Sequence, residues 1–180
     1  GNGSNDVLDL IARSFAEPGR EVIFSQYAFA VYPLATQSVN ATAVVTPAKD
    51  WGHDLDAMLD AITEHTSLIF IANPNNPTGT SLGKQQIVQF LNAVPERVVV
   101  VLDEAYIEYN LGGNFPNGIE LLSEYPNLIV TRTFSKAWGL AALRVGYSIS
   151  SPEIADVLNR VRQPFNVNSL AMAGACEALQ

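Results

Sequence analysis

The amino-acid sequence predicts an α/β fold: a three-layer, doubly wound and mostly parallel sheet. Two observations lead to this prediction. Aliphatic runs without polar alternation recur along the chain, as at residues 67–72 and 97–102, and such runs are typical of strands buried on both faces. Helical segments separate these runs, and this alternation is expected when helices cover both faces of a parallel sheet.

The composition restricts the partners that the protein could have. Its 180 residues are 48% hydrophobic and 16% charged, which fits one globular domain with a sizeable core. The net charge of -8 provides no basic surface for nucleic acid or anionic lipid, and no apolar run is long enough to cross a bilayer. We therefore expect no nucleic-acid partner, no membrane partner and a small-molecule ligand.

Cysteine usage and the two ends of the chain bear on its location and completeness. A single cysteine, Cys176, excludes an internal disulfide and suits a reducing compartment, so we expect a cytoplasmic protein. The chain starts without methionine or a signal-peptide pattern, and the last predicted helix, at residues 168–180, has no terminator. We therefore expect a fragment of a longer protein.

The first half of the chain alternates short helices and strands. We expect a helix at residues 5–15 that follows a glycine-rich loop and has Ser4 or Asn5 as its N-cap. The next predicted elements are a strand at 21–25, a helix at 27–36 that contains Pro33 as an irregularity, a strand at 41–46, and a helix at 54–62 with Asp54 near its cap.

The second half contains the most apolar strands. The strand at 67–72 leads into a loop at 73–79, where two prolines and a glycine exclude regular structure. The other predicted elements are a helix at 82–94, a strand at 97–102, a loop at 112–118, a short helix at 119–124, strands at 128–132 and 144–150, and a helix at 152–162. Ligands bind such sheets at the carboxyl ends of strands, so polar clusters at 73–79, 103–106 and 131–136 should meet in one crevice.

Lys136 is the candidate reactive group. It follows a buried strand through two hydroxyl residues and lies between Phe134 and Trp138. A lysine in a desolvated crevice can act first as a nucleophile and later as a base. We therefore predict that Lys136 forms a Schiff base with pyridoxal phosphate, although an arbitrary lysine is more often a surface residue.

The phosphate of this cofactor would need an anion site. The predicted helix start near Asn5 offers free N–H groups and a positive dipole end, and Gly1 and Gly3 let the backbone approach closely. Arg144 could add a charge-assisted contact, with the hydroxyls of Ser135 and Thr133 nearby. Taken separately, the glycine-rich loop is a weak signal, and Arg144 could equally form a surface ion pair.

The ring nitrogen and the phenolic oxygen of the cofactor would need different partners. Asp103 follows the most hydrophobic strand and could bind the ring nitrogen, or it could cap the following helix. We expect Glu104 to face outward. Asn76 and Tyr106 are candidate donors to the phenolic oxygen, and Tyr27 could stack on the ring, although a tyrosine in an apolar helical pattern is more often core.

Three motifs together resemble the fold-type I, class II aminotransferases, which depend on pyridoxal phosphate. The motifs are residues 73–79, Asp103-Glu104-Ala105-Tyr106-Ile107-Glu108, and Thr133-x-Ser135-Lys136-x7-Arg144-x-Gly146, and the opening residues 1–6 and the Tyr27 region fit the histidinol-phosphate aminotransferase subfamily. By this resemblance, the catalytic residues are Lys136, Asp103 and Tyr106, and the cofactor-binding residues are Gly3, Ser4, Asn5, Tyr27, Asn76, Asp103, Tyr106, Thr133, Ser135, Lys136 and Arg144, with no metal site.

The resemblance also implies an activity and an assembly. It implies amino-group transfer between L-histidinol phosphate and 2-oxoglutarate in histidine biosynthesis, with Lys136 as general base and acid. Family members are homodimers with an N-terminal arm and a C-terminal small domain. Residues 1–180 are therefore expected to be a partial cofactor-binding large domain that lacks both parts.

Other functions remain open at this point. Aromatic aminotransferases and threonine-phosphate decarboxylases share nearly every motif, and a noncatalytic ligand-sensing domain of a transcription regulator could also keep Lys136 and Asp103. A regulator should carry a basic DNA-binding helix, which is not visible here. A metal hydrolase fits worst because His53 and His65 lack metal-ligand spacing, and we expect both histidines to be structural.

Overall fold

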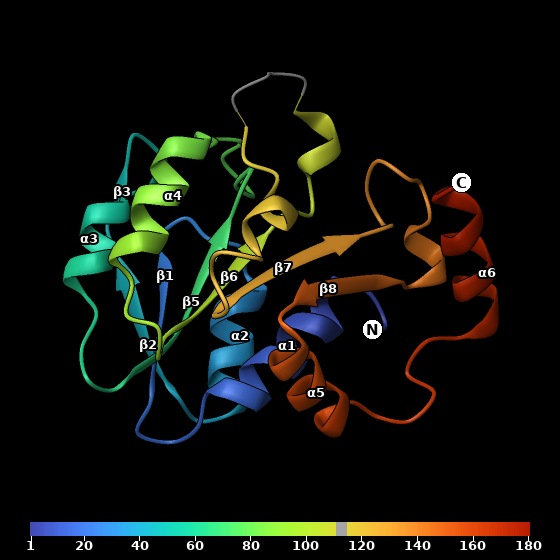
Figure 1. The fold of residues 1–180 in the computed structure, drawn as a ribbon, viewed down its shortest axis with the longest axis horizontal. Coiled ribbons are helices and arrows are strands. Elements are labelled where there is room, and N and C mark those ends of the chain that lie inside the picture. Colours follow the sequence, from blue (N-terminus) through green and yellow to red (C-terminus); the bar gives the residue numbers. More distant parts are fainter. Residues whose placement is uncertain (111–114) are drawn as a thin grey trace.

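The computed structural model describes residues 1–110 and 115–180, which fold around a six-stranded sheet with the strand order β2-β1-β5-β6-β7-β8 (Figure 1). The strands are β1 (Glu21–Ser25), β2 (Thr42–Thr46), β5 (Thr66–Ala72), β6 (Val99–Asp103), β7 (Leu128–Thr133) and β8 (Gly146–Ser150). All neighbours pair in parallel except β8, which runs antiparallel to β7. The predicted α/β fold with a mostly parallel sheet is confirmed.

Helices cover both faces of this sheet and make it the middle of three layers. One face carries α1 (Ser4–Phe15), α2 (Val31–Ser38) and α5 (Pro152–Val161), and the other carries α3 (Leu55–Asp60), α4 (Lys84–Ala93) and the 3₁₀ turn η2 (Gly118–Leu121). Along β5, Leu68 and Phe70 join the core on the α1 face, whereas Ile69 and Ile71 join the core on the α4 face. Apolar residues on both faces of each strand explain the unbroken aliphatic runs in the sequence.

Several boundaries differ from the prediction for clear physical reasons. Helix α2 begins at Val31 instead of residue 27, because Pro33 has no N–H and is tolerated only in the first turn. The N-cap of α1 is Gly3 and not Ser4 or Asn5. Strand β8 begins after Arg144, whose φ of 54° is left-handed. Residues 112–114 of the predicted loop at 112–118 lie outside the described residues.

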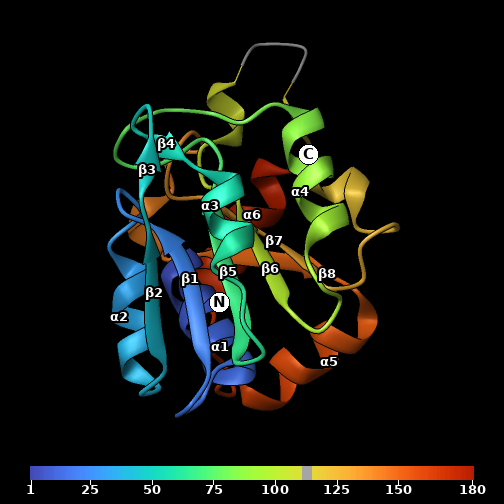
Figure 2. The ribbon, with the colours of Figure 1, turned by 90° about the vertical axis from the view of Figure 1, so that its left-hand side faces the viewer.

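The sequence did not predict a small hairpin, β3 (Ala48–Lys49) and β4 (Gly52–His53), which lies near α3 at the upper end of the molecule in Figure 2. Its two turn residues, Asp50 and Trp51, both have positive φ, as a two-residue hairpin turn of this kind requires. Asp50 is a common residue in such a turn, whereas Trp51 is unusual, because glycine, asparagine or aspartate normally occupies positions with positive φ.

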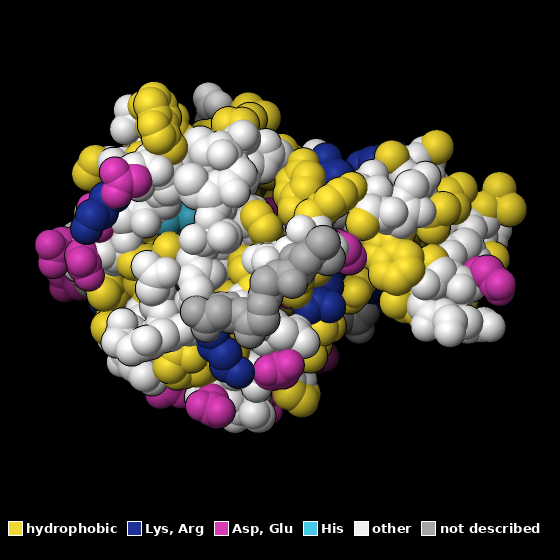
Figure 3. All heavy atoms as spheres, turned by 90° about the horizontal axis from the view of Figure 1, so that it is seen from above, with side chains coloured by type: hydrophobic (Ala, Val, Ile, Leu, Met, Phe, Trp, Pro, Cys, Tyr) yellow, Lys and Arg dark blue, Asp and Glu magenta, His cyan; other side chains and the backbone are white. Residues whose placement is uncertain are grey.

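The last helix, α6 (Ser169–Ala178), lies apart from the sheet and packs against the 3₁₀ turn η3 (Ala141–Leu143), at the right of Figure 1. Apolar side chains gather on this lobe in the space-filling view (Figure 3). Among them, Leu170, Met172 and Leu179 are 73%, 57% and 63% exposed. Within the described residues, no helix is long and apolar enough to cross a membrane.

The sheet topology determines where a ligand can bind. From β1 the chain adds β2 on one side, and it then crosses to the other side, where it adds β5, β6 and β7 in turn. The strand order therefore reverses between β1 and β5, and in open α/β sheets the crevice lies at the carboxyl end of such a switch point. The polar residues that follow β5, β6 and β7 meet at this edge, as the sequence predicted.

Candidate active site

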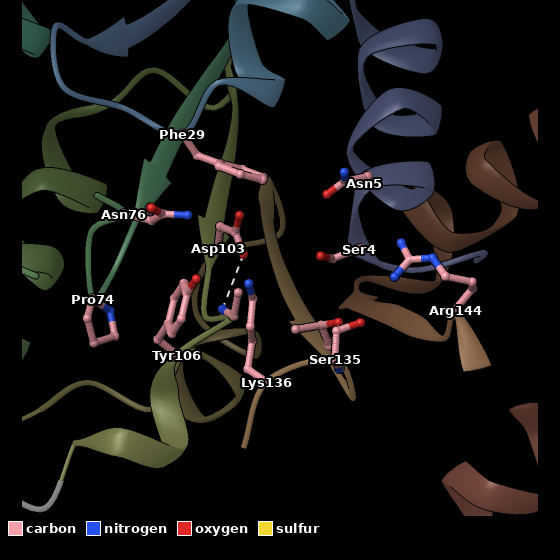
Figure 4. A pocket seen from close by; sticks show the side chains of 13 residues that line it. Ser4, Asn5, Phe29, Pro74, Asn76, Asp103, Tyr106, Ser135, Lys136 and Arg144 are labelled. Atoms are coloured by element: carbon pink, nitrogen blue, oxygen red, sulfur yellow. Dashed lines mark hydrogen bonds between the residues drawn. The ribbon is translucent and has the colours of Figure 1, made fainter. Parts of the chain in front are cut away.

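A cavity of about 170 Å³ lies at the carboxyl ends of β5, β6 and β7 and reaches the first turn of α1 (Figure 4). It is lined by Ser4, Asn5, Phe29, Ala72, Pro74, Asn76, Asp103, Ala105, Tyr106, Thr133, Ser135, Lys136 and Arg144. This set contains nine of the eleven cofactor-binding residues expected from the sequence. The two that do not line the cavity are Gly3 and Tyr27.

Asp103 is the last residue of β6 and is 3% exposed. Its Oδ2 accepts a hydrogen bond from the Tyr32 hydroxyl at 2.9 Å, and its Oδ1 accepts one from the Ala105 N–H at 3.2 Å. Burial raises the pKa of Asp103, whereas these two hydrogen bonds and the charge of Lys136 act to lower it. Asp103 caps no helix, since the 3₁₀ turn η1 (Ile107–Tyr109) has Tyr106 as its N-cap.

Lys136 lies in the loop after β7, and its amine points toward Asp103 in Figure 4. The Nζ atom lies 5.0 Å from the centre of the Tyr106 ring, within the range of a cation–π contact. The desolvated surroundings predicted for Lys136 are wrong for this chain, because Lys136, Ala137 and Trp138 are all exposed. Of the predicted apolar neighbours, only Phe134 is buried, in the core beneath η3 and α6.

The opposite end of the cavity combines a helix N-terminus with an arginine side chain, which are groups that could bind an anion. No side chain caps α1, so its first N–H groups are free to bind a negatively charged ligand. Arg144 lines the same end and donates from Nη1 to the Ala141 carbonyl at 3.1 Å. Glycine is favoured at position 3 because its φ is 86°, and a Cβ there would also force the Arg144 guanidinium to move.

The loop after β5 is held by asparagine side chains. Asn73 forms two hydrogen bonds with the backbone of Leu82, one to its carbonyl at 3.1 Å and one from its N–H at 2.8 Å. Asn75 donates to the Tyr27 carbonyl at 2.9 Å and thereby ties this loop to the loop after β1. These contacts fix the segment that carries Asn76 into the cavity.

Besides Tyr106, the cavity is lined by a second aromatic residue, Phe29, which the sequence reasoning missed. The ring of Tyr27 stacks on Trp51 instead, at a centroid distance of 5.2 Å. Pro33 could have indicated this position of Phe29. A proline is tolerated in the first turn of a helix, so α2 begins only at Val31, and residues 27–30 form a loop at the carboxyl end of β1. The role that the sequence assigned to Tyr27 stays a prediction, and Phe29 becomes the stronger candidate for a ring contact.

The outward orientation predicted for Glu104 is wrong. Its side chain is fully buried on the α4 face of the sheet, where it accepts hydrogen bonds from Arg132 Nε at 2.9 Å, from Arg132 Nη2 at 2.7 Å and from the Gly118 N–H at 2.6 Å. Burial raises the pKa of Glu104, and these donors oppose the shift. Side chains alternate along β6 and its extension, so Glu104 points away from the cavity that Asp103 faces.

The two histidines lie outside the cavity. His53 is 7% exposed and its Nε2 lies 2.8 Å from the Ala72 carbonyl, while burial lowers its pKa. His65 is exposed on the turn before β5. Among the described residues, no group of three or more His, Cys, Asp or Glu side chains could hold a metal ion.

The charges in the cavity are separated. Asp103, Asn76 and Tyr106 lie on one side in Figure 4, Asn5, Ser4 and Arg144 lie on the other, and Lys136 lies between them. This arrangement suits a small molecule that presents a protonated group to the carboxylate, an anionic group to the helix N-terminus, and a carbonyl to the amine.

The chain belongs to the class I and II aminotransferase family, whose model matches residues 1–180. Among curated proteins, it is 65% identical over 180 residues to histidinol-phosphate aminotransferase 2 of Pseudomonas fluorescens and 62% identical over 179 residues to that of Pseudomonas aeruginosa. The alignments cover 100% and 99% of this chain but 49% and 48% of the relatives. The chain thus spans about half the length of the curated relatives that it matches.

A solved structure has the same architecture. The histidinol-phosphate aminotransferase of Sinorhizobium meliloti, in complex with pyridoxal-5′-phosphate, superposes with a TM-score of 0.94 at 35% sequence identity. The match covers 99% of this chain and 49% of that one. The resemblance inferred from the sequence is confirmed at the level of the family and its fold.

Proposed function

We propose that this chain is the pyridoxal-phosphate-binding part of an aminotransferase that acts on L-histidinol phosphate and 2-oxoglutarate in histidine biosynthesis. One observation carries this proposal: an amine, a buried carboxylate and an uncapped helix N-terminus meet around one cavity. The family match and the 65% identity to a histidinol-phosphate aminotransferase support it.

The residues around the cavity fit this cofactor group by group. The N–H groups at the start of α1 and the side chains of Ser135 and Arg144 would hold the phosphate. Asp103 would bind the ring nitrogen, because a buried carboxylate needs a partner of opposite charge. Asn76 and Tyr106 would donate to the phenolic oxygen, in accordance with their position beside Asp103 in Figure 4.

The bound cofactor supplies an electron sink for negative charge that develops on the substrate carbon. Lys136 would attach the cofactor through its amine, and this amine, once displaced by the amino group of the substrate, would take a proton from the substrate carbon and return it, as general base and acid. Asp103 would keep the ring nitrogen protonated, which would strengthen the electron sink. The ring of Tyr106, 5.0 Å from the Lys136 amine, restricts where that amine can move.

We also propose that the whole protein is a cytoplasmic homodimer. The apolar side chains exposed on α6 support further protein contacts on that lobe, since patches of this kind often mark interfaces. The single cysteine supports a reducing compartment. Sedimentation equilibrium would test the assembly, and a purely monomeric protein would contradict the dimer.

The substrate is tested by assaying the purified full-length protein with pyridoxal phosphate, L-histidinol phosphate and 2-oxoglutarate. We expect glutamate to form, and we expect Lys136→Ala to abolish its formation. Lys84→Ala is the matched control, because Lys84 pairs with Glu120 on the surface and does not line the cavity. The variant Lys84→Ala should therefore retain full activity.

Other results of the same assay would contradict the proposed substrate. Transfer from aromatic amino acids without transfer from histidinol phosphate would indicate an aromatic aminotransferase. Release of carbon dioxide from threonine phosphate would indicate a decarboxylase. Tight cofactor binding without turnover of any of these compounds would favour a noncatalytic ligand-sensing domain.

A further inference from the structure

A buried hydroxyl contacts the carboxylate of Asp103 from behind the cavity. Tyr32, in the first turn of α2, is fully buried, and its hydroxyl donates to Asp103 Oδ2 at 2.9 Å. Burial and the neighbouring Asp103 raise the pKa of Tyr32 well above its usual value, so the hydroxyl stays protonated and acts as a donor. The hydrogen bond links α2 to β6, 71 residues further along the chain.

The Tyr32 ring is held on two sides by aromatic residues. It stacks on Phe70 of β5 with a centroid distance of 4.7 Å and an interplanar angle of 2°. Phe29, which lines the cavity, meets it edge to face at 5.8 Å and 89°. Because these contacts restrict the Tyr32 ring, its hydroxyl stays in one position. Residues that pack behind a binding site can orient the ligand-contacting groups in this way.

We propose that Tyr32 is a positioning residue that orients the Asp103 carboxylate toward the ring nitrogen of the cofactor and favours its ionised form. This inference rests on the proposed function, because it needs pyridoxal phosphate as the ligand. Each carboxylate oxygen can accept more than one hydrogen bond, so the contacts from Tyr32 and Ala105 leave Asp103 able to accept another from the cavity.

Other groups act on the same carboxylate. The charge of Lys136 favours the ionised form of Asp103 from the loop after β7, and the neighbouring Glu104 interacts with it through like charge. Burial disfavours the ionised form of Asp103, and among the effects that favour this form the hydrogen bond from Tyr32 is the strongest. Removal of the hydroxyl should therefore raise the pKa of Asp103 further.

The test replaces Tyr32 with phenylalanine, which removes the hydroxyl and keeps the ring. Tyr125→Phe is the matched control: Tyr125 is 9% exposed, and its hydroxyl donates to Asn92 at 2.8 Å in the core on the α4 face. Affinities are measured for pyridoxal phosphate and for its analogue in which a carbon replaces the ring nitrogen. The pKa of Asp103 is followed by carboxyl NMR in the cofactor-free protein.

We expect Tyr32→Phe to weaken pyridoxal phosphate binding about tenfold, to leave binding of the carbon analogue within about twofold, and to raise the pKa of Asp103. Tyr125→Phe should change none of the three. Equal loss of affinity for both ligands would mean a merely structural tyrosine and would overturn the inference, as would an unchanged pKa. If the wild-type protein binds neither ligand, the proposed function fails, and an unchanged pKa would still separately refute the link between Tyr32 and Asp103.

Discussion

The ion pair between Arg132 and Glu104 leads to a quantitative prediction about stability. The Arg132 side chain is 17% exposed, whereas the Glu104 side chain is fully buried and receives three donors, two of them from Arg132. The substitution Arg132→Met would leave Glu104 with the Gly118 N–H as its one remaining donor among the contacts described above. Loss of one partner from a buried pair costs about 3–5 kcal/mol, because the other charge stays buried without compensation.

The partial exposure of Arg132 places the expected cost near the lower end of this range, at about 3 kcal/mol. For a chain of 180 residues, this loss corresponds to a decrease in melting temperature of about 6–12 °C. Differential scanning calorimetry would measure the decrease. The control is Arg160→Met, because Arg160 pairs with Asp156 on the surface and is 74% exposed, so this variant should change stability little.

The effect of Arg132→Met should also depend on pH. Burial raises the pKa of Glu104 in the folded state, so its protonated form favours folding, and stability is lost as the pH rises through that pKa. Without Arg132 the pKa of Glu104 rises further, so the stability deficit should be largest at neutral pH and should shrink as the pH falls through this raised pKa. Equal melting temperatures for Arg132→Met and Arg160→Met, or a deficit that does not shrink in acid, would refute the reasoning.

Two other predictions concern the cavity. In Gly146→Ala a new Cβ would collide with the backbone of Ser4, so both the affinity for inorganic phosphate and the melting temperature should fall. The control Gly19→Ala has open space around its Cβ and should suffer only backbone strain. Phosphate titration and calorimetry would measure these effects, and equal behaviour of the two variants would count against the anion site. Phe29→Leu should weaken pyridoxal phosphate binding more than Tyr27→Leu does, as measured by fluorescence titration, and the opposite order would restore the stacking role first assigned to Tyr27.

The fold was largely predictable because its strongest signals are local. Continuous aliphatic runs mark β5 and β6, and the proline and glycine residues after β5 mark its end. The antiparallel edge strand β8 could not be predicted in this detail, because strand direction depends on the length and path of the connection, not on the pattern of apolar residues. The β3–β4 hairpin was not predicted for a different reason: its strands have only two residues each, and Trp51, the second residue of its turn, is not a common turn residue.

The sequence could place residues at the cavity where a polar side chain of the right type lies at the end of a buried strand. Asp103 ends a buried strand, and Asn76 and Lys136 each follow one, so the topology brings them to one edge of the sheet. Contacts between side chains from distant elements were not predictable. Tyr32 and Glu104 both looked unremarkable in sequence, and their partners lie 71 and 28 residues away.

Lys136 is the residue that we propose attaches pyridoxal phosphate. The chain offers a matched comparison because its other lysines, Lys49 and Lys84, do not line the cavity. Incubation with pyridoxal phosphate, reduction with borohydride and mass spectrometry of the digested protein would show which lysine carries the label. We expect the label on the peptide that contains Lys136, and its presence on Lys49 or Lys84 instead, or on no lysine, would contradict the central claim.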